Sequence, residues 1–110
     1  MTRPAVVLAD VNVDLTLDLP DRSIPKAERK LSEPRISGGG TGGNTAAALA
    51  ALGTPVEFHG TIGDDAFGRW VTEDFWQAGV GLHGLVILHD APTAQVIALL
   101  EPDGERYLVI

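Results

Sequence analysis

Two polar residues on one predicted strand have the chemistry to bind a hydroxyl-rich ligand. Apolar and polar residues alternate strictly over residues 11–19, and Asn12 and Asp14 are the first two polar residues of that alternation. Successive side chains of a strand point to opposite faces, so Asn12 and Asp14 share one face. An aspartate accepts from two hydroxyl groups, while an asparagine both donates and accepts. The alternative is that the two residues form the solvated face of an amphipathic strand.

A second candidate site is a glycine-rich turn that leads into an alanine-rich helix. Residues 37–44 read Ser-Gly-Gly-Gly-Thr-Gly-Gly-Asn, which we interpret as too rich in glycine for any regular element. Glycines let backbone N–H groups approach a ligand closely. No Gly-Lys-Ser or Gly-Lys-Thr follows, so the turn is not a P-loop, and it does not stand in the arrangement of a Rossmann dinucleotide site. A plain connecting loop is the alternative.

The remaining patterns predict an α/β fold with a small additional sheet. Residues 5–9 form a continuous apolar run, typical of a strand covered on both faces, and the alternating segment is predicted to continue that strand out of the buried core into a half-exposed sheet. The next segments predict a helix over 45–52, a strand over 56–62, a helix from Asp64 or Asp65 to Gly79 with an apolar stripe of Phe67, Trp70, Val71, Phe75 and Ala78, and a strand over 82–89. Residues 95–100 and 106–110 flank a turn sequence and predict a hairpin. Residues 20–36 are predicted as a loop and an edge strand.

Composition and charge exclude several classes of function. The chain contains no cysteine, which excludes disulfides and thiolate metal sites. Residues 36–110 carry 2 basic and 9 acidic side chains and account for the whole net charge of −7, so no nucleic-acid partner is expected. No apolar run approaches the roughly 20 residues that span a bilayer, and no membrane partner is expected. The N-terminus shows no secretion signal, so a cytoplasmic location is expected.

Neither the histidines nor the paired aspartates indicate a metal site. His59, His83 and His89 share no short spacing and no pattern of partnered carboxylates, which argues against zinc. Adjacent carboxylates point apart in most backbones, so Asp64 and Asp65 are interpreted as helix-cap and turn residues. No metal ligand is therefore predicted.

Three segments, in order, resemble the ribokinase-like (PfkB-type) carbohydrate kinases. Residues 39–46, Gly-Gly-Thr-Gly-Gly-Asn-Thr-Ala, are similar to the family's first signature, in which two glycines and three further residues precede an asparagine and an alanine-rich helix. Residues 60–68 look like the following family segment, and residues 11–14 resemble the Asn-x-Asp that closes the first strand. Residues 92–93 and 103–106 stand where the family places its lid hairpin. The resemblance covers essentially the whole chain.

The resemblance implies the fold, the activity and the sugar-binding residues. It implies the N-terminal part of a three-layer α/β sandwich with a small β-sheet lid, as a single incomplete domain over residues 1–110 with lid strands near 12–36 and 93–110. The implied activity transfers the γ-phosphoryl group of ATP to a sugar hydroxyl, with Mg²⁺ and a monovalent cation as further cofactors. The implied partners are a small sugar or polyol and a second copy bound through the lid sheet. The implied sugar-binding residues are Asn12, Asp14, Gly40, Thr41 and Asn44.

The chain departs from the family pattern in three ways. The family's catalytic aspartate and nucleotide site lie in a Gly-Ala-Gly-Asp segment without a match here, so no catalytic or cofactor-binding residue is assigned and the chain alone is expected to be inactive as a kinase. Thr41 stands where ribokinases proper carry a lysine, which argues against ribose. Asp10 stands where most members have a small residue.

Two other functions are weighed against the kinase. One is a non-catalytic module for sugar binding or lid dimerisation, and the other is an unrelated small α/β protein. A parallel sheet of about three strands leaves an uncovered edge and an exposed core face. Such exposure favours association, so the isolated 110-residue chain is expected to self-associate or to be partly molten.

Overall fold

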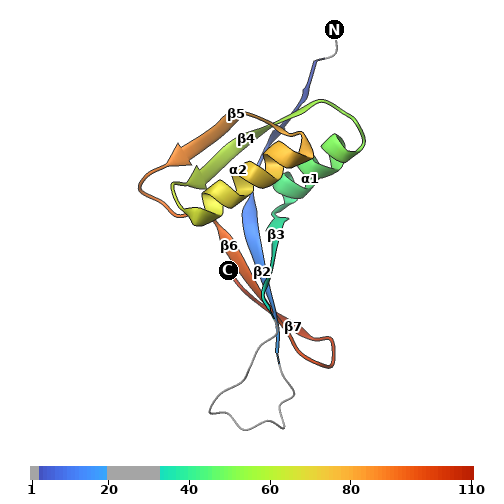
Figure 1. Cartoon of the computed structure of the whole chain (residues 1–110), viewed down its shortest axis with the longest axis vertical. Helices are drawn as coiled ribbons and strands as arrows, with labels where there is room; N and C mark the ends of the chain where they lie inside the picture. Colours follow the sequence, from blue (N-terminus) through green and yellow to red (C-terminus); the bar gives the residue numbers. More distant parts are fainter. Residues whose placement is uncertain (1–2, 20–32) are drawn as a thin grey trace. The chain divides into compact units, whose positions relative to one another are not determined.

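Residues 3–19 and 33–110 are described by the computed structural model of the chain (Figure 1). The chain divides into two compact units, one made of Met1–Val13 with Gly38–Ala94 and the other of Asp14–Ser37 with Gln95–Ile110. In the described part of the chain, no helix is long and apolar enough to cross a membrane.

The first unit is a parallel sheet of three strands with two helices. Its elements are β1 (Ala5–Leu8), α1 (Thr41–Ala51), β4 (Val56–Gly63), α2 (Ala66–Ala78) and β5 (Gly81–Leu88). The strand order is β1-β4-β5, and both neighbouring pairs are parallel. Both helices lie on the same side of this sheet (Figure 1), as successive strand–helix–strand connections place them.

The core of the first unit lies between the helices and the sheet. Val56, Phe58 and Ile62 alternate along β4 and are at most 4% exposed, whereas Glu57 and His59 point to the other face and are half-buried. Phe58 packs against Phe75 of α2 with ring centroids 5.0 Å apart, a separation typical of favourable aromatic pairs. One face of the sheet is therefore covered and carries the hydrophobic core.

Residues at the ends of α2 match the predicted start and stop. Asp65 caps the N-terminus through its side chain, and Gly79 ends the helix in the left-handed conformation, with φ at 85°. Val71 and Phe75 of the predicted stripe are buried. Ala78 is exposed, so its place in the stripe was wrong; it lies in the last turn, at the end of the helix.

The second unit contains most of a sheet of four strands in the order β3-β2-β6-β7; residues 12–13 of β2 and 38–39 of β3 belong to the first unit. Its strands are β2 (Asn12–Asp18), β3 (Arg35–Gly39), β6 (Gln95–Leu100) and β7 (Arg106–Val109). The predicted hairpin is confirmed, because β6 and β7 pair antiparallel and Gly104 takes a φ of 92° in the turn between them. Arg35 forms a two-pronged ion pair with Asp18, with Nη2 3.2 Å from Oδ1. The predicted loop over residues 20–36 lies mostly outside the described residues, and β3 is an edge strand.

Two predictions about the first 19 residues were wrong. The predicted passage from a core strand into a second sheet is confirmed, but one continuous strand does not make it, since β1 ends at Leu8 and β2 begins at Asn12. Nor is β1 covered on both faces, because Val6 is 59% and Leu8 81% exposed. The physical reason is that β1 is an edge strand with helices on one side only; an apolar run alone does not reveal which of its faces is covered.

The prediction that residues 37–44 form no regular element was also wrong. Strand β3 continues to Gly39 and helix α1 already begins at Thr41. Gly42, Gly43 and Asn44 are therefore helical, although glycine disfavours a helix interior by about 1 kcal/mol relative to alanine. Gly42 and Gly43 pack closely against residues 9–11, which leaves little space for a side chain at these helical positions.

Candidate functional site

Asn12 and Gly40, two of the predicted site residues, lie against each other. Asn12 is only 9% exposed, so it does not belong to a solvated strand face. A Cβ atom placed on Gly40 would come within 2.9 Å of Asn12 Oδ1 and 3.2 Å of the Asp10 carbonyl oxygen. Gly40 also has φ 83° and ψ 146°, a backbone conformation that is essentially restricted to glycine. A buried amide thus contacts the backbone immediately before α1.

The first turn of α1 lies directly on the segment that connects β1 to β2. A Cβ atom on Gly42 would come within 2.3 Å of Ala9 Cβ, and one on Gly43 within 2.9 Å of Val11 Cγ2. The N–H of Gly43 donates a hydrogen bond of 3.1 Å to the Asp10 carbonyl oxygen. Glycine is therefore required at position 42, where a Cβ would also come within 2.6 Å of the Asp10 carbonyl oxygen, and at position 43 it avoids a tight contact with the Val11 side chain.

Thr41 and Asn44 follow at the exposed start of α1. They are three residues apart and so lie on neighbouring positions of the helix surface. Asn44 borders a hollow of about 90 Å³ that is also lined by Trp70 and Asp74 of α2, which is small beside the roughly 300 Å³ of a typical ligand pocket. Asp14 belongs to the second unit, where it is half-buried in β2.

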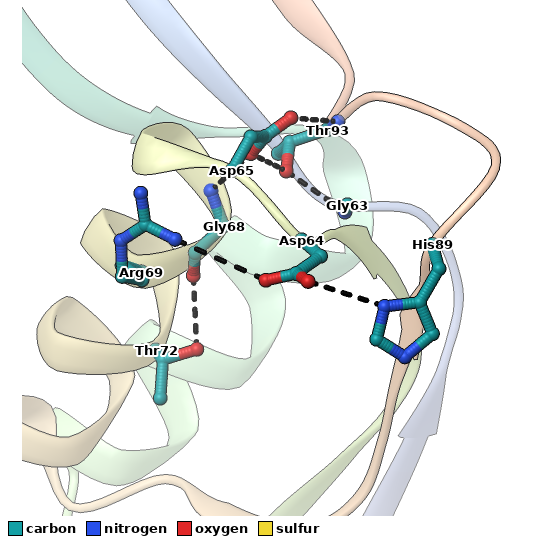
Figure 2. Close-up of polar contacts among 8 residues, drawn as sticks. All are labelled: Gly63, Asp64, Asp65, Gly68, Arg69, Thr72, His89 and Thr93. Carbon is teal, nitrogen blue, oxygen red and sulfur yellow. Dashed lines mark hydrogen bonds and ion pairs between the residues drawn. The ribbon is translucent and has the colours of Figure 1, made fainter.

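A second polar cluster, centred on Asp65, ties the start of α2 to the segment after β5 (Figure 2). Asp65 Oδ1 accepts from the Gly68 N–H at 2.8 Å and from the Thr93 hydroxyl at 2.6 Å. Asp65 Oδ2 accepts from the Thr93 N–H at 2.9 Å. The Thr93 hydroxyl in turn accepts from the Gly63 N–H at 2.9 Å. The sequence predicts Asp65 as a cap of α2, but no local pattern links Asp65 to Thr93, which is 28 residues away.

The hydrogen bonds lower the pKa of Asp65 below its ordinary value. The Thr93 hydroxyl is the largest cause, followed by the N–H groups of Thr93 and Gly68, because all three donors stabilise the ionised carboxylate. Asp65 is therefore a carboxylate at neutral pH. Asp64, beside it, lies 3.1 Å from His89 and 3.9 Å from Arg69 at the surface (Figure 2).

Each histidine lies near a carboxylate that the sequence pattern did not indicate. His59 Nε2 lies 3.4 Å and His83 Nδ1 3.7 Å from the Glu57 carboxylate, and His89 has Asp64 as its partner. His83 and His89 meet their carboxylates between neighbouring strands and loops, so sequence spacing could not reveal these two pairs. Among residues 3–19 and 33–110, no group of three or more acidic or histidine side chains is placed to hold a metal ion.

Comparison with known proteins identifies the family. Residues 3–110 match the pfkB family carbohydrate kinases. The chain belongs to this family. It is 41% identical over 97 residues to the ATP-dependent ribose-1-phosphate kinase of Halopiger xanaduensis, a match covering 86% of this chain and 32% of that protein. It is 30% identical to the ribokinase of Arabidopsis thaliana over 97% of this chain and 29% of the relative.

Solved structures confirm the predicted fold class. The Arabidopsis thaliana ribokinase complexed with ribose and ATP superimposes with a TM-score of 0.88 at 30% identity, over 100% of this pfkB chain and 36% of the other. The Cryptococcus neoformans ribokinase in complex with ADP gives a TM-score of 0.77 at 35% identity, over 98% of this chain and 34% of that one. The chain thus has the fold of the N-terminal part of a ribokinase and spans about a third of the length of these relatives.

Replacing Gly40 by alanine should cost more stability than replacing a glycine of similar φ in open space. Gly53 has φ 81° and no atom near its missing Cβ, so Gly53→Ala should cost about 1–2 kcal/mol for the left-handed backbone. Gly40→Ala must also displace Asn12 or the backbone of residues 10–11. This overpacking should lower the free energy of unfolding by about 1–3 kcal/mol more. Urea unfolding of both variants measures the difference; equal losses would contradict the contact with Asn12.

The Asp65 cluster should make the folding stability of the chain depend on pH in acid. A carboxyl whose pKa is lower in the folded state stabilises the fold above its unfolded pKa of about 3.9 and loses that contribution as pH falls through the folded value. Asp65→Asn should therefore destabilise the chain at neutral pH, and its deficit relative to wild type should shrink below about pH 4. Urea unfolding between neutral and acid pH gives the comparison, with Asp64→Asn as the matched control. If the loss of unfolding free energy in Asp65→Asn is the same at every pH, the lowered pKa of Asp65 is not its cause.

Proposed function

We propose that this chain forms the sugar-binding part of an ATP-dependent carbohydrate kinase. The observation that supports this proposal is the buried amide of Asn12 held against Gly40 at the start of α1. A buried polar group in a fixed position presents its donors and acceptor in defined directions, which is what recognition of a polyol requires. The relatives act on, or are solved with, small sugars, so a small sugar or polyol is the proposed substrate class.

The proposed sugar-binding residues have distinct roles. Asn12 donates to and accepts from sugar hydroxyls, and Asp14 accepts from two of them. Gly40 lets the Asn12 amide lie against the backbone at the start of α1, and Thr41 and Asn44 add polar groups at the exposed helix start. Thr41 is shorter than the lysine of ribokinases proper and carries no charge, so the proposed substrate differs from free ribose.

Binding and orienting the sugar is the step that these residues perform. Transfer of the γ-phosphoryl group depends on positioned charges and metal ions at the phosphate. The family's Gly-Ala-Gly-Asp segment occurs nowhere in the 110 residues, and the described residues offer no acidic cluster for Mg²⁺. The proposal therefore assigns ATP, Mg²⁺ and the monovalent cation to residues outside this chain, which alone should bind sugar without turning over ATP.

Titration calorimetry with D-ribose, D-fructose and ribose 1-phosphate tests the proposal. D-fructose or ribose 1-phosphate should bind saturably, without ATP hydrolysis, and more tightly than D-ribose. Asn12→Ala should weaken that binding about tenfold or more, because a hydrogen bond lost at a buried site costs about 1–3 kcal/mol and about 1.4 kcal/mol is tenfold.

The matched control for this titration is Gln77→Ala, which removes an exposed amide bonded to Glu73 on α2. It should bind sugar like the wild type. Absence of heat with all three ligands would refute sugar binding by the chain, and equal losses in Asn12→Ala and Gln77→Ala would refute the role of Asn12.

A dimer formed through the second sheet is a second candidate function. Strand β7 is at the edge of its sheet, and its residues Tyr107, Leu108 and Val109 are each about half exposed, at 48–54%. An edge strand presents unpaired N–H and C=O groups that can pair with another chain. This apolar edge favours pairing between two copies.

Light scattering after size exclusion, over a wide range of concentrations, measures this association. Wild type should approach the mass of a dimer, and Leu108→Lys should keep the chain monomeric because a charge on the edge opposes pairing. Leu8→Lys changes an 81% exposed leucine on β1 of the first unit and should leave the dimer intact. Association lost in Leu8→Lys but kept in Leu108→Lys would place the contact on the first sheet instead.

A further inference from the structure

Hydrogen bonds on both sides of the consecutive residues Thr93 and Ala94 connect Asp65 to the backbone beside Asn12. Asp65 binds Thr93 through both the hydroxyl and the N–H, at 2.6 and 2.9 Å. The next carbonyl, that of Ala94, accepts from the Val13 N–H at 3.0 Å. From this path, which lies entirely in the first unit, we infer that Asp65 and Thr93 are positioning residues for Asn12. The inference rests on the proposed role of Asn12 in sugar binding.

Thr93 has almost no freedom to move within this cluster. It is 2% exposed, and its hydroxyl and N–H take part in three hydrogen bonds, two with Asp65 and one with Gly63. Two glycines allow the backbones around it to approach closely: a Cβ on Gly63 would come within 2.5 Å of the Thr93 nitrogen, and one on Gly68 within 3.0 Å of its hydroxyl. The backbone at Thr93 is therefore fixed, and it constrains the next residue, Ala94, and the peptide that carries the Ala94 carbonyl.

The orientation of that peptide is passed to Asn12 through Val13. The Ala94 carbonyl accepts from the Val13 N–H, and the peptide between Asn12 and Val13 is planar, so this bond fixes the plane that ends at the Asn12 Cα. Val13 is fully buried, and water cannot readily replace Ala94 as the acceptor. Gly40 bounds the Asn12 side chain from another side, with Asn12 Oδ1 2.9 Å from where a Cβ of residue 40 would lie.

Helix capping alone does not account for this arrangement. To cap α2, Asp65 needs only its bond to the Gly68 N–H. The two bonds to Thr93 add nothing to the helix, yet they use the second carboxylate oxygen and the hydroxyl of a buried threonine. Changing Thr93 while keeping Asp65 therefore separates positioning from capping.

The test compares three threonine variants of the whole 110-residue chain. Thr93→Val removes the hydroxyl and keeps the shape, Thr93→Ser restores the hydroxyl, and Thr72→Val removes a hydroxyl that donates at 2.9 Å to the Gly68 carbonyl without contacting Thr93. Calorimetry with D-ribose, D-fructose and ribose 1-phosphate should show Kd raised about tenfold in Thr93→Val, since small displacements of binding groups carry large penalties. Thr93→Ser and Thr72→Val should bind like wild type.

A second readout separates this inference from the proposed function. In ¹⁵N-correlated NMR spectra without sugar, Thr93→Val should shift the side-chain amide of Asn12 and the backbone amide of Val13, while Thr93→Ser and Thr72→Val should not. If wild type binds no sugar, the proposed function fails and these shifts alone decide whether Thr93 positions Asn12. Wild-type shifts in Thr93→Val, or wild-type affinity where sugar does bind, would overturn the inference. Should Thr93→Val not fold, Thr93→Ala removes the same hydroxyl, keeps the Asp65 cap on Gly68 and provides the same two measurements.

Discussion

The candidate site depends on how closely the first turn of α1 approaches the segment between β1 and β2. Position 42 admits no side chain, because Ala9 and the Asp10 carbonyl occupy the space where a Cβ would lie, and at position 43 a Cβ would crowd the Val11 side chain. This contact decides where α1 begins and brings Gly40 onto Asn12. A larger residue at position 42 would push the helix away and separate Gly40 from Asn12. Glycine is unfavourable in a helix, but here it permits the close packing that places Gly40 beside Asn12.

Two different kinds of interaction fix the surroundings of Asn12. On one side, close packing against Gly40 limits where its amide can lie. On the other, hydrogen bonds from Asp65 through Thr93 and Ala94 fix the adjoining backbone at Val13. Packing limits where the Asn12 side chain can lie, and the directional hydrogen bond at Val13 orients the adjoining backbone, so the two constraints complement one another.

Local features of this chain could be predicted from the sequence, and long-range contacts could not. The α2 cap at Asp65, the stop at Gly79 and the β6–β7 hairpin follow from rules that act over a few residues. The helical state of Gly42 depends instead on a contact with Ala9, 33 positions away in the sequence. Likewise, the pairing of His83 with Glu57 depends on which strands are neighbours. The break between β1 and β2 was not predicted, because the apolar run and the alternating segment are each typical of a strand and adjoin in the sequence.

Burial changes the interpretation of Asn12 more than that of any other candidate residue. From alternation alone, an asparagine in a strand is typical of a solvated face, but Asn12 is 9% exposed and held on two sides. A side chain ordered before the ligand arrives loses little conformational entropy on binding. Thr41 and Asn44 are exposed and retain that freedom. In the proposed function, Asn12 is therefore the fixed reference for the sugar, and residues at the helix start are where relatives acting on different sugars are expected to differ.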